Sequence, residues 1–521
     1  MPLQLQALLP FAAIVAAALA VRFRPARRTN GVVAAAGAGA AATIALIELV
    51  RLAPGERVDS SYLSTFPYAE LTIHSDALSL SFAVVTASTA CLLMLVRVVS
   101  RGDRRDPWFN WLIATAAALS VELAGNLLLL YVAFQLLTLA WSGALDEAAP
   151  RRRWLRFTQQ ASDLGLLFVA GLAIQSVGTS AYSGVPSDTI GPAVFLVALL
   201  PALTRIGALA MPLSGPQAPV LFEPAVAWAA PAGYLVLRLL SLTGGRVPTR
   251  TIEVALFAVG LVAAGMMALL AAVEGLRPSL PVRLVTVLAL TALAISALGT
   301  PLSTLGAGWL WLLLIPLTGL TCVRLGPRSL ARVILLLNLA LVPPGAAFIG
   351  LWLAGQGLIQ STVLSLVPLA LVALVVAAGV ASVIALDEHL RIDLPSGWGL
   401  ALLAAGAFPG IALVYLVAPA ATAVRAIPGG TFQVNPLGIT AGTRFWPAAP
   451  VCLAVAAALF ILLERLGTRL PLRRSSIDVV ARLATIRLPK LRLHNLPDEV
   501  TLRRAYWAVF AAALAAAALA R

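Results

Sequence analysis

Six carboxylates lie in or at the edge of long apolar stretches of this chain, where a charged side chain is costly to bury. They are Glu48, Glu122, Asp163, Glu223, Glu253 and Glu274. A carboxylate in such a place is held by a partner or takes up a proton, so the chemistry on offer is proton or cation binding. Glu48 and Glu253 are near the ends of their stretches, and we expect them to reach the membrane surface. For Glu122 and Asp163 the sequence leaves open both a path role and a structural one, such as pairing of Asp163 with an arginine of the preceding loop.

Glu223 is the best candidate for a site, because it follows a stretch that prolines should interrupt. The stretch 203–220 contains Pro212, Pro216 and Pro219, and broken helices inside membranes usually line a site. Arg205 lies in the same stretch and is the expected partner of Glu223. The two residues form either part of an ion path or an inert buried ion pair.

Motifs for catalysis, cofactors or metals are missing from the sequence. It contains no HExxH, no GxGxxG after a strand, no P-loop and no cysteine cluster. Cys91, Cys322 and Cys452 all fall inside apolar runs without CxxC spacing, as packing residues do. We therefore expect no catalytic site, cofactor or metal in this chain, and we assign any redox or hydrolytic chemistry to a partner.

The composition is that of a multi-pass membrane protein. Of 521 residues, 60% are hydrophobic and 11% are charged, more apolar than any soluble domain needs. The net charge of +15 comes from arginines in short loops, which indicates positive-inside loops rather than nucleic-acid binding. The arginines place the ends of odd-numbered spans in the cytoplasm and both chain termini outside. The only lysine is Lys490.

Apolar stretches of about 20 residues predict an all-α integral membrane fold with about 14–16 transmembrane helices. The expected spans are 3–21, 31–50, 77–97, 108–124, 126–145, 161–180, 190–211, 219–240, 252–273, 282–300, 305–323, 329–350, 357–386, 396–418, 446–463 and 504–520. Residues 56–76 are expected to form an outer loop in which Asp76 caps the third helix.

The segment from Gly125 to Asp163 resembles the antiporter-like membrane subunits of respiratory complex I, Mrp-type cation/proton antiporters and membrane-bound hydrogenases. Those proteins carry G-N-L-L-x-L-x-x-x-W-E, then a basic loop and a helix that opens with G-D. Here Gly125-Asn126-Leu127-Leu128 matches, and Asp163 occupies the acidic position. Gln135 stands where the family has its glutamate.

The resemblance extends over roughly residues 65–390 and includes further departures from the family. Near the seventh span the family's buried lysine falls at Leu200, with Arg205 about a turn away, and Glu223 stands where the family has a histidine. In the twelfth span Val342-Pro343-Pro344-Gly345 resembles the family's P-P-x-x-G, but its lysine position is Leu351. The segment Val273–Arg277 falls on Q-x-D-I-K, which puts Glu274 and Arg277 near another family lysine.

The resemblance implies two inverted five-helix repeats with broken helices 7 and 12. The expected division is 1–107 for N-terminal helices and outer loop, 108–242 and 251–390 for the repeats, 391–463 for C-terminal helices, 464–503 for a basic cytoplasmic amphipathic segment and 504–521 for the final helix.

As implied by the family, the chain is expected to take part in proton or cation translocation within a larger complex. Its partners would be other membrane and peripheral subunits and the lipid bilayer, with no nucleic acid, in a bacterial inner membrane. The ion-path candidates are Glu122, Gln135, Asp163, Arg205, Glu223, Glu274 and Arg277. Two alternatives stay open: the membrane subunit of a DAB-type inorganic carbon pump, and a degenerate paralogue that packs in a complex without moving ions.

Overall fold

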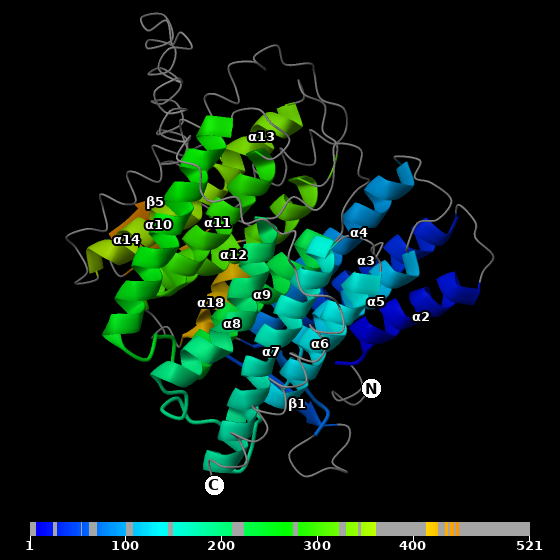
Figure 1. The fold of residues 1–521 in the computed structure, drawn as a ribbon, viewed down its shortest axis with the longest axis horizontal. Coiled ribbons are helices and arrows are strands. Elements are labelled where there is room, and N and C mark those ends of the chain that lie inside the picture. The colour runs from blue at the N-terminus through cyan, green and yellow to red at the C-terminus, as the bar shows by residue number, and fades with distance from the viewer. Residues whose placement is uncertain are drawn as a thin grey trace, which may run out of the picture.

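The computed structural model describes residues 7–23, 29–53, 55–61, 70–99, 108–143, 150–210, 223–274, 280–321, 323, 330–341, 345–360, 413–425, 433–435, 438–441 and 444–447. Within these ranges the chain forms a bundle of long helices that run side by side (Figure 1). Among the described residues, seven helices are long and apolar enough to cross a membrane, and five shorter apolar helices accompany them. The all-α membrane fold predicted from the apolar stretches is therefore confirmed.

The N-terminal half supplies helices whose bounds follow the predicted spans closely. They are α2 (Leu9–Phe23), α3 (Thr29–Arg51), α4 (Ala77–Val99), α5 (Trp108–Glu122), α6 (Leu127–Gly143), α7 (Pro150–Val177) and α8 (Pro192–Leu209). One start differs, because α7 begins at Pro150 and takes in the basic cluster that the sequence places in a loop. Arginine has a high helix propensity, proline is favoured in the first turn of a helix, and Leu155 is buried against the bundle. The helix therefore begins in the basic cluster, before the apolar stretch.

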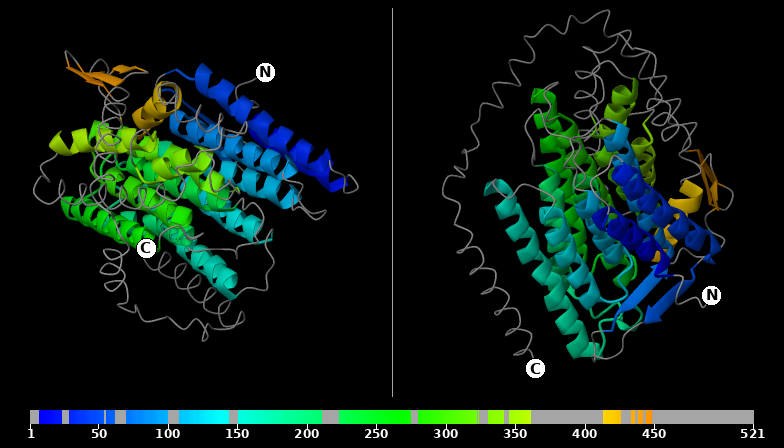
Figure 2. Two further views of the ribbon diagram at one scale, coloured as in Figure 1. Left: turned by 90° about the horizontal axis from the view of Figure 1, so that it is seen from above. Right: turned by 90° about the vertical axis from the view of Figure 1, so that its right-hand side faces the viewer.

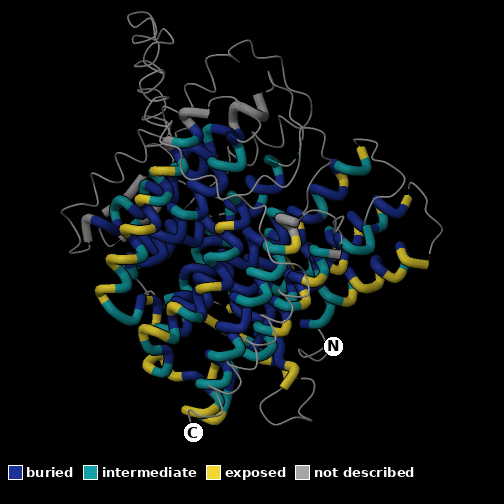
Figure 3. Tube along the Cα trace, viewed as in Figure 1, coloured by how far each residue is buried: buried dark blue, intermediate teal, exposed yellow. Residues whose placement is uncertain are grey.

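The second half continues the bundle from a π-helix. Its elements are η2 (Pro224–Ala229), α9 (Ala230–Leu242), α10 (Arg250–Glu274), α11 (Leu280–Ser296), α12 (Pro301–Thr321), α13 (Leu330–Leu339), α14 (Ala347–Gln360), η3 (Leu413–Val417) and α18 (Ala418–Val424). The centre of the bundle is α12 with η2 and α9, which pack on α4 and α8 and are almost wholly buried (Figure 3). Exposed apolar side chains of α10, such as Val259 and Val262, instead face outward, as expected for contact with lipid.

Small residues allow the closest helix contacts. A side chain on Gly306 of α12 would lie 2.6 Å from the backbone oxygen of Gly350 in α14. The two helices therefore touch through their backbones, which is common where packing rather than the hydrophobic effect holds membrane helices together.

A β-hairpin occupies the segment that the sequence predicts as an outer loop. Strands β1 (Arg57–Ser61) and β2 (Thr72–Asp76) pair antiparallel with Asp59 opposite His74. The hairpin lies at one end of the helices (Figure 2, right). A second small sheet joins β3 (Gln433–Asn435), β4 (Gly438–Ala441) and β5 (Arg444–Pro447). The predicted Asp76 cap is confirmed, because Ser79 N donates to Asp76 Oδ1 at 2.8 Å.

Several predicted features lie outside the described residues. They include the prolines between 212 and 219, Pro343 and Pro344, Arg277, the segment 464–503 and the final helix. The two inverted repeats, the broken helices and the domain boundaries stay predictions.

Candidate functional site

An ion pair between Asp163 and Arg205 is buried inside the bundle. Arg205 Nη1 donates to Asp163 Oδ1 at 2.6 Å and Nη2 to Oδ2 at 3.1 Å, and both side chains are fully buried. The guanidinium also donates to Thr138 Oγ1 at 3.0 Å and to the Pro201 carbonyl at 3.1 Å. It lies 4.3 Å from the ring centroid of Phe134, close enough for a cation–π contact.

Three helices converge to build this site. At one end of the bundle α6 begins, α7 ends and α8 begins, and there Leu127 N donates to Ser180 O at 2.9 Å. From that end Thr138 is 11 residues into α6, Asp163 is 14 residues back along α7, and Arg205 is 13 residues into α8. At about 1.5 Å per residue these positions are roughly 16 to 21 Å deep. A membrane about 30 Å thick that begins at this end of the helices would therefore enclose the pair.

The ion pair has polar neighbours on the side away from that end. Gln159 is one turn from Asp163 on α7, and its Oε1 accepts from Trp141 Nε1 at 3.1 Å. Trp141 in turn makes an edge-to-face contact with Trp228 of η2, with centroids 5.7 Å apart. Among the described residues Gln159 Nε2, Trp228 Nε1 and Arg205 Nε have no hydrogen-bond partner although they are buried. Donors left open in this way are suited to bind water.

Glu122 forms a second buried carboxyl position. It is the last residue of α5, and Thr86 Oγ1 of α4 donates to its Oε1 at 2.5 Å. Its Oε2 has no hydrogen-bond partner within the described part of the chain. A buried carboxyl with one free oxygen can be satisfied by a proton or by water, which is the behaviour expected of a proton-binding group.

The other predicted site residues lie apart from this pair or have simpler roles. Gln135 Nε2 donates to the Gln160 carbonyl at 3.1 Å, so this side chain links α6 to α7. Glu223 is buried at the start of η2. Arg205 pairs with Asp163 where the sequence analysis expects Glu223. Glu274 ends α10.

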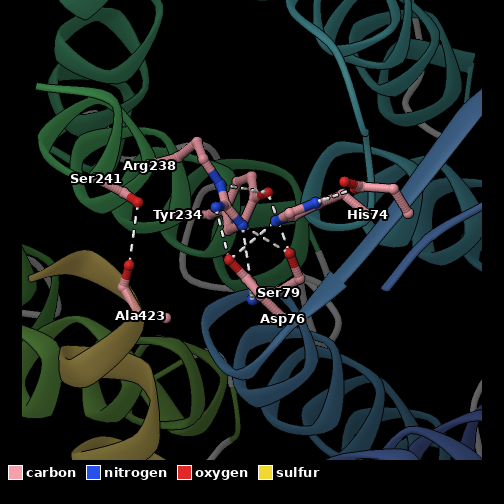
Figure 4. Close-up of polar contacts among 8 residues, drawn as sticks. His74, Asp76, Ser79, Tyr234, Arg238, Ser241 and Ala423 are labelled. Carbon is pink, nitrogen blue, oxygen red and sulfur yellow. Dashed lines mark hydrogen bonds and ion pairs between the residues drawn. The ribbon is translucent and has the colours of Figure 1, made fainter. Parts of the chain in front are cut away.

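A second charged network, which was not predicted from the sequence, joins the β-hairpin to α9 (Figure 4). Arg238 forms two bonds to Asp76, at 2.7 and 2.9 Å, and donates to Tyr234 Oη at 3.1 Å. His74 lies between Asp59 and Asp76, at 2.5 and 3.1 Å. The sequence did contain a signal for this network: Arg238 lies inside the eighth apolar stretch, four residues after Tyr234 and therefore on the same helix face.

Strand β2, which carries His74 and Asp76, also pairs with the segment between α5 and α6 through backbone hydrogen bonds. His74 N donates to Leu123 O at 3.0 Å and Gly125 N donates to Thr72 O at 2.7 Å. A side chain on Gly125 would lie 2.6 Å from that Thr72 oxygen. Glycine is therefore needed where the break meets β2.

Metal ligands do not cluster in the part of the chain that the structure describes: no three His, Cys, Asp or Glu side chains there are placed to hold an ion together.

Comparison with known proteins rests on structure alone, since no protein-family model and no curated protein matches the sequence. The structure of the Mrp complex from Dietzia sp. DQ12-45-1b is similar with a TM-score of 0.69 and 18% identity, covering 100% of this chain and 63% of that chain. This chain therefore spans less than two thirds of the Mrp chain it matches.

Two respiratory complexes are also similar. The membrane-bound sulfane sulfur reductase, an archaeal respiratory membrane complex, gives a TM-score of 0.65 and 16% identity over 88% of this chain and 84% of that chain. Respiratory complex I from Thermus thermophilus with bound NADH gives 0.61 and 18% over 81% and 98%. The chain is thus a multi-pass membrane protein that shares its fold with chains of these three membrane complexes.

Proposed function

We propose that this chain is a membrane subunit of an energy-coupling complex in a bacterial inner membrane, and that it passes protons or cations through buried carboxyl groups. The observation that carries the proposal is the Asp163–Arg205 pair inside the apolar bundle. Ionisable residues at such depth are expensive and usually serve transport. The fold shared with subunits of the Mrp complex and complex I supports it. The other subunits of the complex would be its partners.

The charge chemistry of the pair suggests how it would work. Arginine stays protonated at any accessible pH, so Arg205 is a fixed positive charge and Asp163 is the member that exchanges a proton. Asp163 is neutralised either by the guanidinium or by a proton. When a proton arrives, the protonated oxygen of Asp163 stops accepting from Arg205 and the other bond is no longer between opposite charges, while Thr138 and the Pro201 carbonyl still hold the guanidinium. Pairing and protonation would therefore alternate.

Glu122 supplies a second proton-binding position in this scheme. Its single bond from Thr86 leaves Oε2 available to a proton or to water. The absence of lysine from the apolar spans, with Lys490 the only lysine in the chain, means that any route must use carboxyls and water around fixed arginines.

Proton flux measured in liposomes tests the proposal. The full chain, with the subunits that co-purify with it, is reconstituted around a pH-sensitive dye, and a potassium gradient with valinomycin drives proton uptake. We expect wild-type uptake to fall at least about tenfold in Asp163→Asn with unchanged complex yield. Asp188→Asn is the matched control, because Asp188 is an exposed carboxylate in the loop before α8. Full uptake by Asp163→Asn, or no uptake by the wild type, would favour the scaffold alternative. Bicarbonate uptake in place of proton uptake would favour the inorganic carbon pump.

A further inference from the structure

The β1–β2 hairpin carries a row of alternating charges that the translocation proposal does not use. The row runs from Asp59 through His74 and Asp76 to Arg238, with each neighbouring pair in contact. Figure 4 labels the last three of these residues. The side chain of Asp59 is 35% exposed, whereas that of His74 is 4% exposed. The row therefore starts at the surface of the hairpin and ends inside the bundle, on α9.

Hydrogen bonding in this row requires a protonated imidazole. Nδ1 of His74 faces an oxygen of Asp59 and Nε2 faces an oxygen of Asp76. A neutral imidazole has one N–H, so one of its nitrogens would turn a lone pair toward a carboxylate, while the imidazolium donates at both. Burial lowers the pKa of His74, but the hydrogen bonds to Asp59 and Asp76 outweigh burial and raise this pKa above its ordinary value of 6.5.

Among the described residues, the side-chain hydrogen bonds of His74 are those to Asp59 and Asp76. Glu48 of α3 and Glu122 of α5 are the carboxyls of the neighbouring helices, and Glu122 bonds Thr86 of α4 rather than the imidazole. Arg238 and Tyr234 come from α9, and Tyr182 of η1 (Tyr182–Gly184) contacts the imidazole edge-on at 5.7 Å. The positive charge of Arg57 in β1 helps to lower the pKa of Asp59. The segment 123–126 pairs with β2 through backbone groups and has no ionisable side chain. Within the described residues the neutral-range titration of this cluster belongs to His74.

Protonation also sets the charge balance of the cluster. With His74 protonated, two carboxylates and two cations sum to zero. Loss of the proton leaves a net negative charge on the cluster and breaks one hydrogen bond of the buried imidazole, whose nitrogen then turns a lone pair toward a carboxylate. Asp76 is at once the cap of α4 and the partner of Arg238, so a weakened row loosens the hairpin from both helices.

We propose that His74 is a proton-binding site that holds the hairpin on α4 and α9 while it is protonated and releases the hairpin when the solution at this end of the bundle turns alkaline. The proposal does not depend on ion translocation.

The pH dependence of hairpin stability follows from the shifted pKa values of His74 and Asp59. A raised histidine pKa gives stabilisation that is complete below 6.5 and is lost as the pH rises through the higher folded value. The hydrogen bond to His74 lowers the pKa of Asp59 below its ordinary 3.8. The acid limit is therefore below that of a free aspartate, and the hairpin is held most firmly between about pH 4 and 6.5.

Histidine NMR provides the first test, because the chain has only three histidines. The double variant His389→Gln/His494→Gln, in nanodiscs, leaves His74 as the single imidazole signal. We expect its titration midpoint above 6.5, falling by about one unit when Asp59→Asn is added. A midpoint at or below 6.5, or one that Asp59→Asn leaves unmoved, would overturn the proposal.

Hydrogen–deuterium exchange of the full chain tests the mechanical step. After correction for intrinsic exchange, peptides covering β1 and β2 should lose about tenfold in protection between pH 6 and pH 9. His74→Gln should show the lower protection at both pH values, and Asp188→Asn should behave as the wild type. If His74→Gln does not fold, Asp59→Asn replaces it, with a midpoint moved to lower pH. Wild-type protection that does not change with pH would contradict the proposal.

Discussion

Removal of Arg205 alone should harm the protein more than removal of both members of its pair. Arg205 donates four hydrogen bonds, two of them to Asp163. Arg205→Met would leave a fully buried carboxylate without its countercharge, which costs about 3–5 kcal/mol. The double variant Asp163→Leu/Arg205→Met removes both charges and fills the space with apolar groups. Such replacements are often neutral, so we expect it to recover most of the loss.

Thermal unfolding followed by tryptophan fluorescence measures this difference, and the chain has 11 tryptophans to report it. At about 2 °C per kcal/mol for a chain larger than 150 residues, the single variant should lose roughly 6–10 °C in Tm. The double variant should stay within a few degrees of the wild type. Equal losses in the two variants would show that Asp163 and Arg205 are not coupled, and would refute the assignment of the pair.

Three further predictions concern other parts of the bundle. Glu122→Gln keeps an acceptor for Thr86, so Tm should hold within about 2 °C while proton uptake in liposomes slows; full uptake would remove Glu122 from the path. Gly125→Ala places a methyl group against a backbone oxygen of β2 and should lower exchange protection of that strand, and a variant with wild-type protection would contradict the close contact. Reporter fusions at Arg153 and Arg474 should both report the cytoplasm, and a periplasmic signal at either would overturn the arginine-based topology.

The helices were predictable from the sequence because each needs about 20 apolar residues, and that length is visible without any partner. The start of α7 was not predicted, because the arginines after Pro150 are charged and so resemble a loop, although arginine also favours helix. The β1–β2 hairpin was also missed. The stretch from Arg57 to Ser61 has one branched apolar residue, and the pairing of β1 with β2 decides its conformation.

The sequence predicted the residues of the buried ion pair but not that they contact each other. Asp163 and Arg205 both stood out as ionisable residues in apolar stretches, but the contact between them spans 42 residues and depends on how α7 packs on α8. Nearness along the chain and the adjacent prolines favoured Glu223 instead. Arg238 was missed for the same reason, because its partner Asp76 is 162 residues away and already had a complete explanation as a helix cap.

Proton uptake by the charge-free pair variant tests the central claim most directly. Asp163→Leu/Arg205→Met is expected to fold and assemble, so a loss of transport in it cannot be assigned to a damaged bundle. The translocation account predicts wild-type complex yield with proton uptake reduced to the level of protein-free liposomes. Uptake by this variant at the wild-type rate would contradict the account and leave the Asp163–Arg205 pair a structural feature.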